Sequence, residues 1–256
     1  MSSRLLLAFS LISFCTATAE DKKIPPATQE QLSAITARGR SLFEYERAVW
    51  EAHRALASTH KATDTPMRFI AHHSDSGWAV VIGSIDRAKG SFEMSYEVAE
   101  TGSAGKVKLN WLKPSRSAPM FFEVAATAID TAQADFHGES VRYDTAVLPA
   151  DADRFYVYVY PAITKPGVLP LGGDVRYLVS PNGKTIIEKR PLHKTILETT
   201  NAGPAQVVAG FHSHVITDVP EDTDVVHAML RRIPEYVGCA GRVYKVAADG
   251  TITLTK

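Results

Sequence analysis

The spacing of apolar residues changes near Met67, and this change limits most strongly the folds open to the chain. Upstream, apolar residues recur every three or four positions, which is the period of one helical face. Thr28 and Gln31 have the spacing of a capping box, which predicts that the helix begins there. The residues of the apolar stripe are Leu32, Ile35, Leu42, Val49 and Leu56. We therefore expect one long N-terminal helix that docks on the rest of the fold.

Downstream of Met67 the apolar runs are short and β-prone. A Ser-Asp-Ser-Gly turn joins the first two runs, which favours a hairpin, and two further runs extend it into an antiparallel meander. The runs are 67–72, 78–85, 91–98 and 107–112. Residues 119–136 predict a second helix. Residues 144–153 contain Pro, Asp and Ala, which break both periods, so a boundary is expected there.

The second half is expected to be rich in strands. Residues 155–160 alternate valine with tyrosine, which suits a central strand, and Asn182 with Gly183 is a strong hairpin signal because both tolerate positive φ. A helix over 218–233 has acidic residues at its start and Pro234 after its end. The other strand runs are 175–179, 184–188, 206–215, 241–246 and 251–254. Together these patterns predict an α+β fold, with an N-terminal helix, an antiparallel β meander, and a C-terminal, mainly antiparallel sheet with one packed helix.

The first residues have the organisation of an export signal. Arg4 precedes an apolar run over 5–14, and a small-residue cleavage site ends at Ala19. Because the apolar run is shorter than the roughly 20 residues that a membrane-spanning helix needs, we expect cleavage after Ala19 and export to the periplasm or the medium, with no membrane span. Cleavage also removes Cys15 and leaves only Cys239, so no intramolecular disulfide can form. Burial must then hold the fold together.

The chain divides into three expected regions. Residues 1–19 form the signal peptide, residues 20–148 an N-terminal helix plus α+β region, and residues 149–256 a C-terminal, β-rich α+β region. The 28 basic and 28 acidic residues balance, so no basic excess points to nucleic acid or to an anionic membrane surface. The partner that remains is a ligand or protein that the sequence does not specify.

One group of residues carries a chemical argument. His212 and His214 are two positions apart on an expected strand, so their side chains project on the same side. The following helix start supplies a carboxylate, Asp224, or Asp222 if the helix begins differently. Two imidazoles and a carboxylate can hold zinc and leave a position open for water, whose pKa the metal would lower. The structural alternative is that the helix dipole favours these acids and that the histidines are ordinary strand residues.

This segment resembles the JAMM (MPN-type) metallopeptidases, whose motif is His-x-His-Pro followed by Ser-x-x-Asp. In this chain Val215 replaces the proline, Glu221 takes the place of the serine, and Asp224 arrives one residue early. The resemblance implies a zinc site and hydrolysis. It also implies an upstream glutamate as general base, for which Glu188 and Glu198 are the candidates.

The whole chain also resembles uncharacterised bacterial exported proteins. The shared features are an Ala-x-Trp stretch at 48–50, a Gly-Trp strand start at 77–78 and a Gly-Gly-Asp-x-Arg segment at 172–176. These are packing and turn residues, so the resemblance implies a family but no activity. Because the sequence shows no complete catalytic set, we expect an exported protein that binds a ligand or partner without catalysis. The alternative is a zinc-dependent hydrolase of JAMM-like type, or an inactive relative of one.

Overall fold

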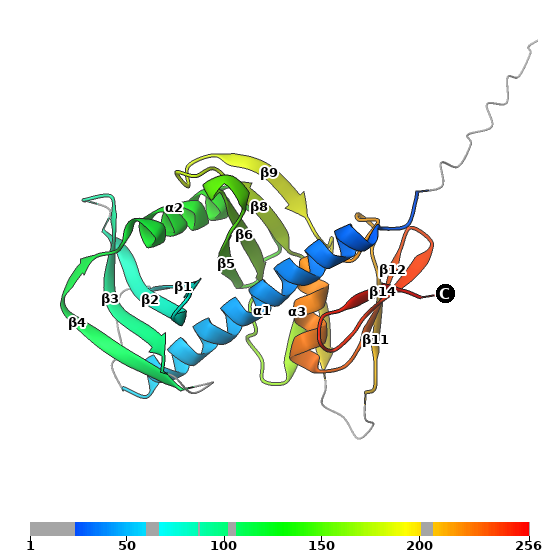
Figure 1. Ribbon diagram of the computed structural model, residues 1–256, viewed down its shortest axis with the longest axis horizontal. Coiled ribbons are helices and arrows are strands. Elements are labelled where there is room, and N and C mark those ends of the chain that lie inside the picture. Colours follow the sequence, from blue (N-terminus) through cyan, green and yellow to red (C-terminus); the bar gives the residue numbers. More distant parts are fainter. Residues whose placement is uncertain (1–23, 60–66, 87, 102–105, 201–206, 256) are drawn as a thin grey trace, which may run out of the picture.

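The computed structural model describes residues 24–59, 67–86, 88–101, 106–200 and 207–255 (Figure 1). Within them the α-helices are α1 (Gln29–Ala57), α2 (Met120–Asp135) and α3 (Asp222–Arg231). These helices pack with sheets that are almost entirely antiparallel, which confirms the α+β fold expected from the sequence. None of the described helices is long and apolar enough to cross a membrane. The expected signal peptide, residues 1–19, lies outside the described residues.

The N-terminal sheet is the meander that the sequence predicts. Its strands pair in chain order and are antiparallel throughout. They are β1 (Arg68–Ser74), β2 (Gly77–Asp86), β3 (Ser91–Glu100) and β4 (Val107–Ser117). Every second residue of β3 from Phe92 to Val98 is buried, as expected for a strand with one face on a core. Helices α1 and α2 contribute to that same core.

The central sheet contains a strand that the sequence does not predict. Its order is β5-β6-β8-β9, and its strands are β5 (Tyr143–Pro149), β6 (Phe155–Pro161), β8 (Val175–Val179) and β9 (Ile186–Pro191). The prediction of a break over 144–153 is wrong for its first part, because β5 pairs with β6 and buries Ala146, Val147 and Leu148. The short strands β7 (Val168–Leu171) and β10 (Leu197–Thr200) form a separate pair.

The C-terminal sheet has one parallel pair. Its order is β11-β12-β13-β14, and its strands are β11 (Gly210–Ser213), β12 (Glu235–Cys239), β13 (Arg242–Val246) and β14 (Ile252–Leu254). β11 and β12 are parallel because α3 carries the chain back between them, as a crossover helix does. The predicted strand over 206–215 is longer than β11. The predicted helix start at Asp218 is also displaced, because the N-cap is Glu221.

Helix α1 joins the two ends of the molecule. Its N-terminal end lies beside the C-terminal sheet and its C-terminal end beside the N-terminal sheet (Figure 1). The predicted capping box of Thr28 and Gln31 is present. Leu32 and Ile35 enter one apolar cluster with α3 and the C-terminal sheet, whereas Leu42 and Ala52 enter the larger cluster of the other sheets. The long helical stripe therefore supplies both cores.

Candidate metal centre

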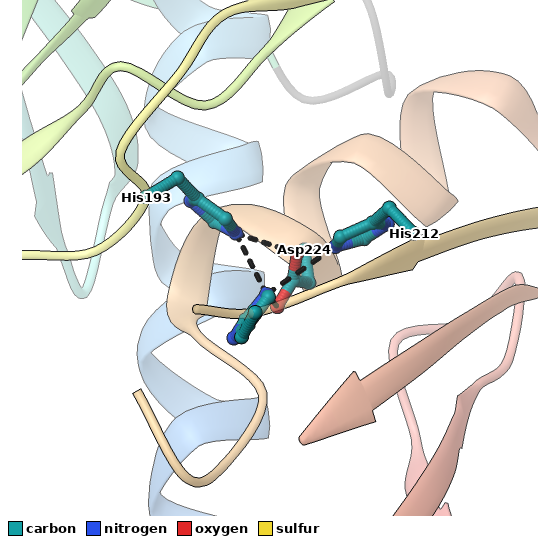
Figure 2. A group of neighbouring side chains, drawn as sticks. His193, His212 and Asp224 are labelled. Carbon is teal, nitrogen blue, oxygen red and sulfur yellow. Dashed lines mark hydrogen bonds and ion pairs between the residues drawn. The ribbon is translucent and has the colours of Figure 1, made fainter. Parts of the chain in front are cut away.

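Four side chains converge on one point in the C-terminal half (Figure 2). His193 follows β9, His212 lies on β11, His214 follows β11 directly, and Asp224 lies in the first turn of α3. One nitrogen or oxygen atom from each lies within 4.8 Å of the other three. The sequence predicts three of these residues, His212, His214 and Asp224, as ligands, and the structure adds His193.

The distances between the facing atoms are short. His214 Nε2 lies 2.9 Å from His193 Nε2 and 3.3 Å from His212 Nε2. Asp224 Oδ1 lies 3.1 Å from His193 Nε2 and 2.9 Å from His212 Nε2, while Asp224 Oδ2 lies 3.2 Å from His214 Nε2. All three imidazoles therefore present Nε2 to the same carboxylate.

The strand explains how the two histidines come to share one side. Side chains two positions apart on a strand project to the same face, and β11 is kept extended by its parallel pairing with β12. The pairing continues past the end of β11, because the N–H of His214 donates to the carbonyl of Gly238 at 2.8 Å. His212 and His214 thus face the start of α3 together.

A carbonyl fixes the tautomer of His214. Its Nδ1 lies 3.1 Å from the carbonyl oxygen of Val219 and 2.7 Å from Oγ1 of Thr217. A carbonyl can only accept, so Nδ1 carries the proton. In the neutral ring Nε2 then holds a lone pair, which points at the centre. This is the form of histidine that binds a metal through Nε2.

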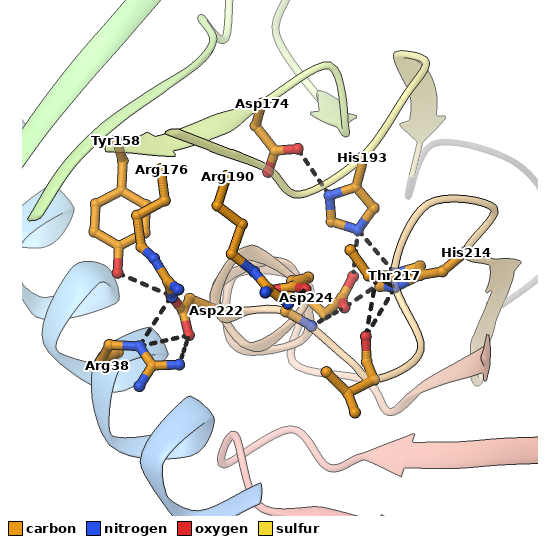
Figure 3. A network of polar contacts seen from close by, with 12 residues as sticks. Arg38, Tyr158, Asp174, Arg176, Arg190, His193, His214, Thr217, Asp222 and Asp224 are labelled. Carbon is orange, nitrogen blue, oxygen red and sulfur yellow. Dashed lines mark hydrogen bonds and ion pairs between the residues drawn. The ribbon is translucent and has the colours of Figure 1, made fainter. Parts of the chain in front are cut away.

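His193 is oriented in the same way by Asp174, which precedes β8. Nδ1 of His193 lies 2.8 Å from Oδ1 of Asp174 (Figure 3). The hydroxyl of Thr223 donates to the other oxygen of that carboxylate. The carboxylate accepts the Nδ1–H, so Nε2 of His193 also faces the centre. A carboxylate behind a histidine is the usual outer support of a metal ligand.

Two glycines allow Asp174 to lie so close to the His193 segment. Gly172 and Gly173 both have positive φ, at 90° and 66°. A Cβ at Gly172 would lie 2.3 Å from the carbonyl oxygen of Thr195, and one at Gly173 would lie 2.5 Å from Cγ1 of Ile196. The Gly-Gly-Asp segment therefore places the outer support of the site.

Asp224 is positioned by the first turn of α3, in which it lies. The N–H of Glu221 donates to its Oδ2 at 2.7 Å, which closes a capping box at the start of α3. Its side chain is completely buried, and so is that of His214, while those of His193 and His212 are 8% and 5% exposed. Water has almost no access to the facing atoms.

Such an arrangement requires a positive charge. Two lone-pair nitrogens 2.9 Å apart repel each other and the Asp224 carboxylate unless a proton or a metal ion lies among them. In the metal-free chain, burial lowers the pKa of His193, but Asp174 and Asp224 outweigh it and raise that pKa well above its usual value. Burial raises the pKa of Asp224, but His193, His212 and His214 hold it well below its usual range.

The geometry fits a small transition-metal ion. Bonds of about 2.0–2.2 Å from histidine nitrogen and carboxylate oxygen imply ligand separations of roughly 3.3–3.5 Å around a tetrahedral ion. The separations of 2.9–3.3 Å given above are within a few tenths of an ångström of these values, and the remaining pair, His193 and His212, has its ligand atoms within 4.8 Å of each other. Three imidazoles and one carboxylate suit zinc and its first-row neighbours, whereas calcium and magnesium prefer oxygen ligands.

Asp222, the substitute ligand expected from the sequence, lies outside the cluster. Its carboxylate pairs with Arg38 of α1 at 3.0 Å and with Arg176 of β8, and the hydroxyl of Tyr158 donates to it at 2.9 Å (Figure 3). Glu221 pairs with Arg190 at 2.6 Å. The acids at the start of α3 thus divide, with Asp224 facing the histidines and the other two facing arginines.

The two glutamates considered as general bases lie at the surface. Glu188 is exposed on β9, and Glu198 is exposed on β10, where it pairs with Lys165 at 2.9 Å. Neither belongs to the cluster found among the described residues.

His193 could not be recognised from the sequence, because it lies nineteen positions before His212 in a segment without helix or strand periodicity.

No protein-family model, no curated protein and no solved structure matches the chain.

Proposed function

We propose that this protein binds one zinc ion through His193, His212, His214 and Asp224. The observation that carries the proposal is the meeting of Nε2 of His193 with Nε2 of His214 at 2.9 Å beside the buried Asp224 carboxylate. Asp174 and Val219 hold the outer nitrogens of these two rings as donors, which leaves both inner nitrogens as ligands.

The donor set favours a closed centre over a hydrolytic one. Zinc sites that stabilise structure are surrounded by four protein ligands, while catalytic sites have three and keep the fourth position for water. His193 supplies a fourth ligand here, and the ligand side chains are at most 8% exposed. We therefore propose that the protein is a non-catalytic, exported binding protein whose C-terminal half is stabilised by zinc.

The bound ion would join parts of the chain that are otherwise separate. His193 belongs to the segment between β9 and β10, whereas His212 and His214 belong to β11 and its end, and Asp224 lies in the first turn of α3. Zinc would hold these three segments together by bonds stronger than hydrogen bonds. Because the unfolded chain lacks the site, the binding free energy adds to the free energy of unfolding.

Metal analysis of the purified protein tests the proposal. We expect one zinc ion per chain, and we expect it to be absent from the double variant His212→Ala/His214→Ala. His137→Ala, which removes an exposed histidine elsewhere, is the matched control and should retain the metal. A wild-type protein that remains free of zinc after dialysis against the ion, or a double variant that keeps it, would contradict the proposal.

Cobalt substitution separates a closed centre from an open one. In the wild-type protein, azide should leave the visible absorption of bound Co²⁺ unchanged, because four protein ligands occupy the ion. His193→Ala opens one position, so azide should then shift the spectrum. An azide response in the wild-type protein would favour the hydrolytic alternative.

A further inference from the structure

The outer edge of β11 has no neighbouring strand among the described residues. β11 pairs on one side with β12, through the N–H groups of Gly210 and His214 and the parallel register between them. In a parallel ladder, alternate residues direct their N–H and C=O groups to opposite edges. The main-chain groups of Phe211 and Ser213 therefore point away from β12, at the free edge of the sheet.

Two other edge strands of this protein, β4 and β9, carry features that discourage pairing. β4 presents Lys108, Lys113 and Pro114, and β9 ends in Lys189, Arg190 and Pro191. Charged side chains and proline are the usual means by which proteins protect a sheet edge. Residues 207–217, which contain β11, have no proline and no Lys, Arg, Asp or Glu. This edge is not protected.

The same segment exposes large apolar side chains. Val208 is 73% exposed, Phe211 69% and Val215 74%, and among the described large apolar residues only Met120 is more exposed. Phe211 and Val215 alternate with the buried His212 and with His214, so the strand directs its ligands inward and its apolar residues outward. An apolar strand edge with free main-chain groups is a template for another strand.

We infer that β11 pairs antiparallel with β11 of a second copy of this chain. About a two-fold axis at His212, the free groups of Phe211 face those of Ser213 in the second copy, and each strand supplies the donors and acceptors that the other lacks. The 28 basic and 28 acidic residues of the full sequence balance, and cleavage after Ala19 removes only Arg4 among them, so little long-range repulsion acts between copies. The two C-terminal sheets become one continuous sheet, with the apolar side chains at the junction.

The inference does not depend on the metal. The pairing groups are main-chain atoms of Phe211 and Ser213, whereas this segment contributes to the metal site through the side chains of His212 and His214. Measuring the mass and the metal content of the same samples keeps the two ideas apart. A monomer that contains zinc contradicts only the pairing, and a dimer without zinc contradicts only the metal site.

Sedimentation over a range of concentrations, with the protein purified in its exported form, tests the pairing. We expect the wild-type mass to rise to that of a dimer. Phe211→Lys places a charge on the edge and Ser213→Pro removes an outward N–H, so each should weaken dimerisation at least about tenfold. Leu254→Lys adds the same charge at β14, the opposite edge of the same sheet, and should dimerise like the wild type.

Three results would overturn the inference. They are a wild-type protein that stays monomeric at every concentration, edge variants that dimerise as tightly as the wild type, and a β14 control that is weakened equally. Circular dichroism of each variant establishes that it is folded. Because Phe211 is largely exposed, Phe211→Lys keeps the test valid even if proline at Ser213 prevents folding.

Discussion

Asp174 touches no facing atom of the centre, yet it decides which nitrogen of His193 points inward. Asp174→Asn replaces a charged acceptor by a neutral amide, so His193 should be held less firmly and be less basic. Loss of such a support typically weakens metal binding about 10–100-fold. Competition with a chelator measures the change. Asp75→Asn, in an exposed turn of the N-terminal sheet, should bind zinc as tightly as the wild type.

Glu46 predicts a pH dependence that is independent of the metal. Burial, helped by Asp144 and opposed by a hydrogen bond from Tyr160, raises its pKa from 4.5 to about 7. The folded state then keeps this proton to higher pH than the unfolded state does. The free energy of unfolding should therefore fall as pH rises from about 4.5 to about 7.

Glu46→Gln should make that fall smaller, because the amide does not titrate and can still accept from Tyr160. Denaturant unfolding at a series of pH values measures the effect. Glu139→Gln, at an exposed position, should leave the pH dependence as it is in the wild type. Equal slopes for the wild type and Glu46→Gln would show that burial does not disfavour the charged form of this carboxylate.

At this scale the sequence reveals only the local part of the site. His212 and His214 can be recognised because strand geometry alone puts them on one side, and Asp224 because it lies at a helix start. His193 and Asp174 cannot, because they are brought in by the packing of distant segments. The Gly-Gly-Asp motif indicates a turn in the sequence, and only the fold shows that its aspartate supports a histidine.

Among the elements, helices α1 and α3 can pack closely only because Gly39 of α1 has no side chain. A Cβ at Gly39 would lie 2.4 Å from Cβ of Val225 and 2.7 Å from the carbonyl oxygen of Asp222. Helix propensity favours alanine over glycine by about 1 kcal/mol. We nevertheless expect Gly39→Ala to lower the free energy of unfolding by about 1–3 kcal/mol, because the helices must move apart.

Chemical denaturation measures this change, with Ser41→Ala as the control. Ser41 is exposed on the same helix, so alanine there should gain a little stability from propensity alone. If Gly39→Ala were as stable as the control, the close approach of the two helices would not be needed.

The elements themselves could be predicted where their signals are local. The capping box sets the start of α1, and the change of period separates helix from meander. The sequence does not predict β5, because its three buried residues are consecutive and show no alternation, and because Asp144 and Pro149 lie within the strand. The parallel pairing of β11 with β12 depends on where α3 packs, and a strand pattern alone does not contain that information.

On the scale of the whole molecule, the central sheet, helix α1 and the C-terminal sheet all contact the start of α3. Glu221 reaches Arg190 of β9, Asp222 reaches α1 and β8, and Asp224 reaches the three histidines. The central sheet, the long helix and the C-terminal sheet all bind one helical turn (Figure 3). Such long-range pairing of buried charges could not be derived from the balanced composition.

Removing the metal should therefore destabilise the molecule as one unit. A ligand present at about 100 times its dissociation constant adds about 2.7 kcal/mol. Each kcal/mol shifts the melting temperature by about 2–4 °C in a protein of this size. We expect a chelator to lower Tm by several degrees in calorimetry, while His212→Ala/His214→Ala should not respond to it. An equal response of both proteins would assign the effect to something other than this centre.

Gly172 gives an engineer a way to alter the centre without changing any residue that faces it. A single methyl group at this position collides with the main chain at Thr195, two residues beyond His193. The easiest relief is for that segment to swing outward and take its imidazole with it. The three remaining ligands, His212, His214 and Asp224, would then be accessible to solvent. The residue at position 172 therefore determines whether the metal centre is closed or open.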